Sequence, residues 1–293
     1  DEEERLIACF FVHLIVELKP REKLRRLVKP KTAMDHIYYV KRIMQRKHKR
    51  RFDYLSTVKT ILERATLDFC LLEGMESLSP KRREAISDNE KRRMLCTPNN
   101  TTIKSRLVKA LIWQSCFGIN FRAALLVCSS TGFRKDEIVG PFTSLKMSRA
   151  SLFWIIGGVI VRQPSAQMLL NLSDDDYAGI LVGAAKNDRF GISCNPHPIY
   201  MRHANDPTNA AAALKQLVLK YPIDPADARR TPLFFYNEDF EPFTAGLVDA
   251  AFEAVCLSFM APQRFRVISW HSWRVTLACN LLAAGAPPNV IMA

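Results

Sequence analysis

The sequence predicts a mainly helical protein with a small antiparallel β-sheet in its second half. In the first hundred residues, apolar side chains recur at the three- and four-residue spacing of helices, and no strand pattern interrupts them. Between residues 150 and 200, short runs of β-branched residues separated by glycine or polar turns replace that spacing. Helical spacing returns after residue 208. The expected architecture is therefore a helical first domain followed by an α+β domain.

The length of 293 residues predicts two domains, because a single hydrophobic core stops growing at about 250 to 300 residues. Thr97-Pro98-Asn99-Asn100 is rich in turn residues, so we expect domains at 1–97 and 98–293. The acidic start and the lack of an apolar run near 20 residues predict an intracellular protein without a membrane span. Its expected location is the nucleus in a eukaryote and the cytoplasm or nucleoid in a prokaryote. The eight scattered cysteines lack metal-ligand spacing, so we expect no metal or other cofactor.

The expected first domain consists of about four helices. Apolar spacing predicts helices over residues 5–18, 36–51 and 54–73, the last closed by Gly74 as a C-cap. Ser79-Pro80 suits the N-cap and first position of a short charged helix that ends near residue 97.

Positive charge is concentrated in one segment of that domain. The net charge is +13, and from Lys19 to Arg51 fourteen Lys or Arg face two acids, a local excess of 14 − 2 = +12. Such a cluster indicates contact with nucleic acid or an anionic membrane, with a solvated helical face as the alternative. The apolar side of the helix over 36–51 has no Trp or Phe anchor, which favours double-stranded DNA over a membrane. The predicted DNA contacts are Arg42, Arg46, Lys49, Arg50 and Arg51.

The expected second domain begins and ends with helices around a small sheet. Helices are predicted over 102–114, 121–129, 208–220, 244–259 and 273–284. Strands are predicted over 152–156 and 159–162, joined by a Gly157-Gly158 hairpin, and over 179–184 with a return strand that runs through Ile192 and Cys194 toward Ile199. Lys186 then lies at or beside a hairpin tip.

Two short motifs hold the candidate site residues. Gly132 breaks the helix over 121–129, so Arg134 starts a new helix with Glu137 one turn along on the same face, where its carboxylate can hold the guanidinium. A fixed arginine fork suits a phosphate, although most Arg-x-x-Glu pairs are surface ion pairs. His271 and Arg274 are likewise three apart at the start of the last helix, where backbone N–H groups favour an anion.

The order of these motifs resembles tyrosine recombinases of the phage integrase type. The matching residues are Thr-Gly-x-Arg-x-x-Glu at Thr131 to Glu137, Lys186 on a hairpin, and His-x-x-Arg-x-Thr-x-Ala-x-x-Leu-Leu-x-x-Gly from His271 to Gly285. The motif match covers about residues 100 to 293. Residues 1–97 resemble the family's core-binding domain only in being helical, and no motif is shared there.

This resemblance implies DNA strand cleavage and rejoining through a 3′-phosphotyrosine, without metal or nucleotide. Arg134 and Arg274 would neutralise the nonbridging oxygens, Lys186 would protonate the departing 5′-oxygen, and His271 would transfer a proton or hold the phosphate. Glu137 would orient the arginine. Lys146 and Arg189 also flank hairpins and are alternatives to Lys186. The family suggests a homotetramer on DNA.

The nucleophile departs from the family pattern. A tyrosine is expected a few tens of residues after Arg274, whereas every tyrosine of this sequence precedes His271. We therefore expect this chain to bind DNA without forming a covalent adduct. A noncatalytic DNA-binding protein derived from a recombinase and a type IB topoisomerase-like enzyme remain alternative functions.

Overall fold

The chain folds into two compact units, Asp1–Lys81 and Arg82–Ala293. We describe them from a computed structural model, which describes residues 2–17, 28–49, 56–74, 83–140, 147–181 and 198–287. The described residues are mainly helical and include a small antiparallel sheet, as the sequence predicts, together with a second, two-stranded sheet that was not predicted. No described helix is long and apolar enough to cross a membrane.

The division between the units precedes the predicted boundary at 97/98. Residues 83–97 belong to the second unit because hydrogen bonds tie them to its far end. Arg264 donates from Nε to Glu90 Oε1 at 2.7 Å and from Nη2 to the carbonyl oxygen of Ala85 at 2.8 Å. The backbone N–H of Ile86 donates to Thr276 Oγ1 at 2.8 Å. Contacts across so many residues leave no trace in local turn composition, which is why the sequence suggested a division at 97/98 whereas the structure divides after Lys81.

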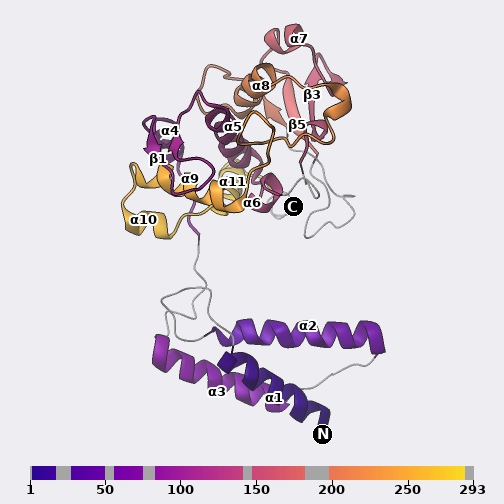
Figure 1. Ribbon diagram of the computed structural model, residues 1–293, viewed down its shortest axis with the longest axis vertical. Coiled ribbons are helices and arrows are strands. Elements are labelled where there is room, and N and C mark those ends of the chain that lie inside the picture. The colour runs from indigo at the N-terminus through magenta and orange to yellow at the C-terminus, as the bar shows by residue number, and fades with distance from the viewer. Residues whose placement is uncertain are drawn as a thin grey trace. The chain divides into compact units, whose positions relative to one another are not determined.

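Unit 1 consists of three helices, α1 (Glu2–Glu17), α2 (Pro30–His48) and α3 (Ser56–Glu73) (Figure 1). Each contributes one side to a small core, in which Phe11, Ile37 and Val58 are fully buried. All three helices were predicted, and α2 begins earlier than expected because Pro30 suits the first turn of a helix.

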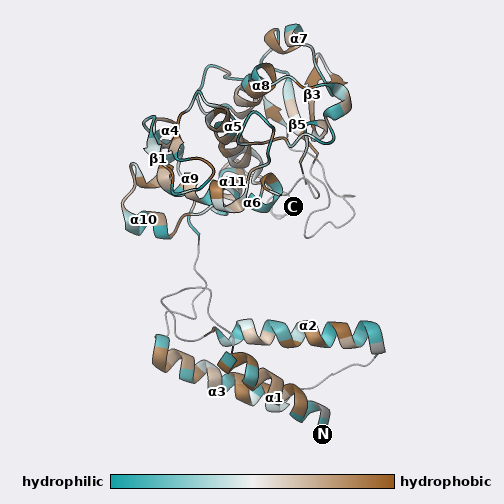
Figure 2. Ribbon diagram, viewed as in Figure 1, coloured by the Kyte–Doolittle hydropathy of each residue, from teal (hydrophilic) through white to brown (hydrophobic). Residues whose placement is uncertain are grey.

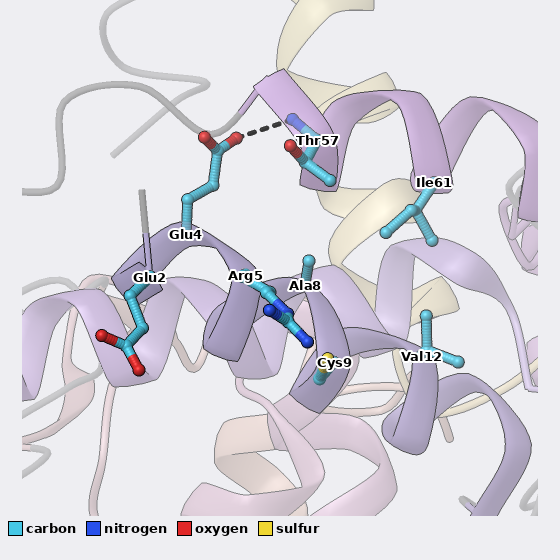
Figure 3. A pocket seen from close by; sticks show the side chains of 8 residues that line it. All are labelled: Glu2, Glu4, Arg5, Ala8, Cys9, Val12, Thr57 and Ile61. Carbon is cyan, nitrogen blue, oxygen red and sulfur yellow. Dashed lines mark hydrogen bonds between the residues drawn. The ribbon is translucent and has the colours of Figure 1, made fainter.

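The α1 and α3 helices are joined at one end by Glu4. Its Oε1 accepts a hydrogen bond from the backbone N–H of Thr57 at 2.7 Å (Figure 3). The same oxygen accepts from Ser56 Oγ at 3.1 Å, so Glu4 satisfies donors in the first turn of α3. These bonds, led by that from the Thr57 N–H, lower the pKa of Glu4. An open hollow of about 810 Å³ lies alongside, and its charged lining residues are Glu2, Glu4 and Arg5. Two carboxylates against one arginine make the hollow unsuited to a DNA backbone.

Unit 2 contains the other described elements. Its helices are α4 (Asp88–Leu95), α5 (Cys116–Thr131), α6 (Lys135–Ile138), α7 (Ala166–Leu170), α8 (Ala210–Lys220), α9 (Ala245–Leu257), α10 (Pro262–Arg266) and α11 (Ser272–Ala283), with short 3-10 turns η3 (Arg149–Ser151) and η4 (Pro225–Asp227). Its strands are β1 (Thr101–Thr102), β2 (Ala110–Leu111), β3 (Leu152–Ile156), β4 (Val159–Val161), β5 (Tyr177–Ile180) and β6 (Ile199–Tyr200).

The α5 helix lies at the centre of unit 2 and packs against α8 and α11. Most of its residues are buried, and its ribbon is largely brown in Figure 2. Ser115 caps its start by accepting from the Gly118 N–H at 3.1 Å. Gly132 ends it in the left-handed conformation, at φ +66°, as the sequence predicts. The position where the chain turns toward Arg134 is thereby fixed by a buried helix.

The main sheet has the strand order β4-β3-β5-β6, and all its pairs are antiparallel. Gly157 and Gly158 form the predicted hairpin, both with positive φ, and pair Ile156 with Val159. The described return strand is short, Ile199–Tyr200. Lys186, the tip residue of the predicted hairpin, lies outside the described residues, as do its alternatives Lys146 and Arg189.

Two sequence predictions in this unit were wrong. Residues 102–114 form no helix but the β1-β2 hairpin, with Thr101 opposite Leu111. Ile103 and Leu111 are both buried, and their spacing suggested one apolar stripe of a helix. They are buried instead because they lie on opposite arms of the hairpin. The predicted cap, Ser79-Pro80, lies outside the described residues, but residues 83–87 of the predicted helix are not helical. The α4 helix begins at Asp88, where Ser87 forms a reciprocal cap with Glu90.

Candidate functional site

Arg134 begins α6 and is held by Glu137. The Arg134 backbone N–H donates to Glu137 Oε2 at 2.7 Å, and its Nη1 donates to Glu137 Oε1 at 3.3 Å. The predicted pair therefore forms, with Arg134 as the N-cap rather than inside the first turn. Glu137 is almost buried, with a side chain 10% exposed, while that of Arg134 is 32% exposed. The carboxylate fixes the base of the arginine and leaves other guanidinium donors available.

The Gly132 turn brings the two motifs together. Arg274 donates from Nη1 to the carbonyl oxygen of Gly132 at 3.3 Å. A Cβ placed on Gly132 would lie 3.0 Å from Leu277 Cδ2 and 3.6 Å from Arg274 Cα, so the turn packs directly on α11. Arg134 and Arg274, distant in sequence, consequently belong to one region of unit 2.

Two buried tryptophans fix the start of α11. Trp270 and Trp273 are 4% and 1% exposed and both pack against Phe252 of α9. His271, between them, is the N-cap residue and is exposed. Its backbone N–H donates to Ser269 Oγ at 3.2 Å. The indoles therefore anchor the junction while His271 and Arg274 emerge at the helix N-terminus, as predicted.

The electrostatics of Arg274 show an excess of positive charge. Burial lowers the pKa of Arg274, the nearby Arg134 lowers this pKa further, and only Glu137 opposes these effects. Glu137 thus bonds to one guanidinium group, that of Arg134, and acts on the partly buried Arg274 through its charge alone. An anion placed between the two guanidinium groups would relieve their repulsion. A phosphate, which accepts hydrogen bonds in pairs from arginine, fits that need.

The same field acts on His271. The imidazole is partly covered although the residue as a whole is exposed, and this loss of water lowers its pKa below 6.5. Arg274, Arg134 and Arg83 each lower this pKa further. The imidazole is therefore neutral at pH 7, with one nitrogen able to donate and the other able to accept. A neutral histidine beside two arginines can take up a proton when an anion arrives.

A cleft of about 380 Å³ adjoins these residues, and Arg134 and His271 line one side of it. Its described lining also includes Lys135, whose Nζ lies 2.7 Å from Asp249 Oδ2, and two other acids. With His271 neutral, three carboxylates face two cations, so the cleft itself does not favour an anion. Arg274 is not part of its lining, and the anion would lie on the Arg274 side of Arg134.

Three of the five predicted DNA contacts in unit 1 lie within the described residues. Arg42, Arg46 and Lys49 are exposed on or directly after α2, and none of the three makes an ion pair within the described ranges. Ile37 on the opposite side of α2 is fully buried, so the helix presents the basic face that the sequence predicts. Arg50 and Arg51 lie outside the described residues.

Sequence reasoning missed Arg83. Its Nη1 donates to the carbonyl oxygens of Arg266 at 3.0 Å and Ile268 at 3.5 Å, and its charge acts on His271. No local motif surrounds Arg83, and only the folding of residues 83–87 onto the α10–α11 connection brings it there. It adds a third arginine to the field around His271.

No protein-family model matches this chain, and a comparison with curated proteins finds no match. In the described residues, no group of three or more His, Cys, Asp or Glu side chains is placed to hold a metal ion.

Proposed function

We propose that this chain grips a backbone phosphate of double-stranded DNA between Arg134 and Arg274, as part of a strand cleavage and rejoining reaction of the tyrosine recombinase type. The observation that supports the proposal most directly is the position of both guanidinium groups beside the Gly132 turn, where Arg134 bonds to Glu137, Arg274 bonds to the Gly132 carbonyl, and the charge of Arg134 lowers the pKa of Arg274. The order of the sequence motifs supports the type of reaction.

The chemical role of the pair follows from the charge of the reaction. When a hydroxyl attacks a phosphodiester, negative charge grows on the two nonbridging oxygens, and fixed guanidinium donors stabilise it. Glu137 and the Gly132 carbonyl hold Arg134 and Arg274 before DNA arrives, so little reorganisation is needed. Neither group loses its charge at any physiological pH.

Proton transfer completes the proposed reaction. A tyrosine oxygen forms a bond to phosphorus, its proton passes to neutral His271, and the bond from phosphorus to the 5′-oxygen breaks as Lys186 supplies a proton to that oxygen. Rejoining reverses each transfer. Every tyrosine of the 293-residue sequence precedes His271, so none of them occupies the position at which the family carries its nucleophile. The role of Lys186 rests on the sequence motif alone.

A noncatalytic DNA-binding protein is the second candidate function. The position of the tyrosines favours this function, because the pair of Arg134 and Arg274, which we call the clamp, can bind a phosphate without any nucleophile. A nicked suicide duplex that traps a covalent phosphotyrosyl adduct separates the two, and we expect this chain alone to form no adduct.

Fluorescence anisotropy with a labelled duplex tests the clamp itself. We expect Arg134→Met and Arg274→Met each to lower affinity about tenfold or more, because each removes charge-assisted hydrogen bonds to phosphate. The double variant should lose less than the sum of the two, since both groups bind one phosphate. Arg202→Met is the control, because Arg202 forms an exposed surface pair with Asp175. Additive losses, or losses equal to that of the control, would contradict a shared phosphate.

A further inference from the structure

A second cavity in unit 2, of about 210 Å³, lies between the main sheet and α8. Its walls come from η3, β3, the β4–α7 connection, α7 and the end of α8. They are mostly apolar, with Leu152, Leu169 and Val218 among them. None of Arg134, Glu137, His271 or Arg274 lines this cavity. It is therefore separate from the proposed DNA clamp.

Arg149 lines the cavity as a buried cation without a counter-ion. The residue is 5% exposed, and its Nη2 donates to the carbonyl oxygen of Tyr221 at 2.9 Å. Its buried Nη1 has no hydrogen-bond partner, and no carboxylate pairs with it anywhere in the described chain. Burial lowers the pKa of Arg149 to about 10, which still leaves the side chain charged at pH 7. Arginine is rarely buried unless it is paired, so this environment lacks a partner.

Trp154 adds a second unpartnered donor to the same cavity. Its side chain is fully buried, and Nε1 makes no hydrogen bond with any described residue. Trp154 lies two positions after Leu152 on β3, so both face the same side of the sheet and both line the cavity. Guanidinium and indole N–H groups only donate. Both residues of the cavity wall therefore carry a buried donor that lacks an acceptor.

The remaining charge around the cavity has the same sign. Arg162 is exposed and also lines it, and the described lining residues include no acid. An anion is therefore favoured, whereas a cation or a neutral donor is not. A volume of about 210 Å³ limits the ligand to a small molecule or one terminal residue.

We propose that this cavity binds a small apolar monocarboxylate, whose two oxygens accept hydrogen bonds from Arg149 and Trp154 and whose carbon body packs against Leu152, Leu169 and Val218. A carboxylate matches one buried guanidinium in charge and geometry. A phosphate dianion fits less well, because Arg149 is the one buried cation of the described lining, and the exposed Arg162 interacts with water. The ligand is either a free acid or the C-terminal residue of a peptide, since both offer the same chemistry.

Benzoate and 4-methylpentanoate are suitable probes, titrated into the full chain by calorimetry and followed by tryptophan fluorescence. We expect saturable binding of both, and at least tenfold weaker binding of benzyl alcohol, which has the ring without the charge. A short peptide ending in leucine, compared with its C-terminal amide, distinguishes the two sources. Tighter binding of the free acids and tighter binding of the peptide with a free C-terminal carboxylate would each support the carboxylate site.

Arg149→Met should weaken benzoate binding about ten- to hundredfold, because it removes the charged donor. Arg122→Met is the matched control. Arg122 of α5 also donates to a backbone carbonyl, that of Pro207 at 2.9 Å, and has a buried unpartnered Nε, but does not line this cavity. We expect the Arg122→Met variant to bind benzoate with the affinity of the unaltered chain.

Ala166→Trp tests the site without touching its buried donors. Ala166 is exposed at the start of α7 and lines the cavity, so an indole there should block it while leaving thermal stability unchanged. We expect this variant to lose benzoate binding and to keep DNA binding. The proposal is overturned if neither acid binds the unaltered chain, if the alcohol binds as well as the acids, or if Arg149→Met and Ala166→Trp both bind benzoate normally. The two donors would then be satisfied by water alone.

Discussion

Arg274 donates from Nη1 to the carbonyl oxygen of Gly132 at 3.3 Å, across a separation of 142 residues. This bond joins the end of α5 to the start of α11 and so places two distant motifs in one site. Gly132 makes the approach possible, because its φ of +66° and its lack of a Cβ let the turn pack against Leu277 and Arg274. The backbone of a glycine thereby helps to position an arginine.

Gly132→Ala should destabilise unit 2 by about 1–3 kcal/mol, because alanine is strained at positive φ and its Cβ would press on Leu277. DNA affinity should fall as well, since Arg274 must shift. Gly157→Ala is the matched control, with φ +56° and no atom within 4 Å of the added Cβ. Urea unfolding followed by tryptophan fluorescence measures both variants. Equal destabilisation, together with unchanged DNA affinity, would show that the Gly132 contact is unimportant.

The pKa of His271 gives a prediction about pH. The pKa is lowered below 6.5 in the free protein, so the folded state favours the neutral imidazole. The resulting contribution to stability is present above pH 6.5 and is lost as the pH falls through the lowered pKa. A bound phosphodiester reverses this preference, because its negative charge offsets Arg134 and Arg274 and raises the pKa of His271.

Duplex affinity should therefore increase as the pH falls from the raised pKa of His271 in the complex toward its lowered pKa in the free protein, by less than tenfold per pH unit because one proton is linked. Anisotropy titrations at several pH values, with NMR of the imidazole in the free and bound states, measure the effect. His271→Gln should remove the pH-dependent part, whereas His203→Gln, in the β6–α8 connection, should not. A pKa of His271 that stays constant or falls on DNA binding would place the phosphate elsewhere.

Local patterns in the sequence predicted much of the fold and of the site. Gly132 after an apolar run indicated the end of α5, and Gly157-Gly158 indicated the β3–β4 hairpin, since backbone conformation decides both. The three-residue spacings of Arg134 with Glu137 and of His271 with Arg274 also gave their local geometry. That the two pairs meet depends on α5 packing against α11, which spacing alone could not show.

Features made by distant contacts were missed. Arg83 approaches His271 only because residues 83–87 fold onto the α10–α11 connection, and the donors of the second cavity, Arg149 and Trp154, come from a turn and a strand that no motif links. The β1-β2 hairpin was missed because Ile103 and Leu111 repeat at a spacing that also fits a helix. In each case tertiary packing, rather than local propensity, determines the outcome.

Arg264→Lys should destabilise unit 2 by about 1–3 kcal/mol, because lysine cannot reproduce the bonds from Nε and Nη2 to Glu90. The hydrogen bond from Arg264 is the largest cause of the lowered pKa of Glu90. Glu90 therefore adds stability above pH 4.5 that is lost as the pH falls through its lowered pKa. All four tryptophans lie after residue 82, so their fluorescence reports on unit 2.

The Arg264→Lys variant should lose less stability than the unaltered chain as the pH falls from 4.5 to the lowered pKa of Glu90. Without the arginine, the pKa of Glu90 lies nearer its ordinary value of 4.5. Arg202→Lys, at the exposed pair with Asp175, should change neither stability nor its pH dependence. An unchanged pH profile in Arg264→Lys would mean that Glu90 does not depend on Arg264.

Replacing Arg42, Arg46 and Lys49 together by alanine should reduce the salt dependence of duplex binding. Each lost phosphate contact lowers the slope of log affinity against log salt by about 0.9, so three contacts account for at most about 2.7. The three side chains are exposed and form no ion pair in the part of the chain that is described, so the fold should persist. Lys59→Ala with Arg64→Ala is the control, because both pair with acids on α3. A slope that stays the same in the triple variant would exclude α2 from the DNA interface, whatever the state of the clamp.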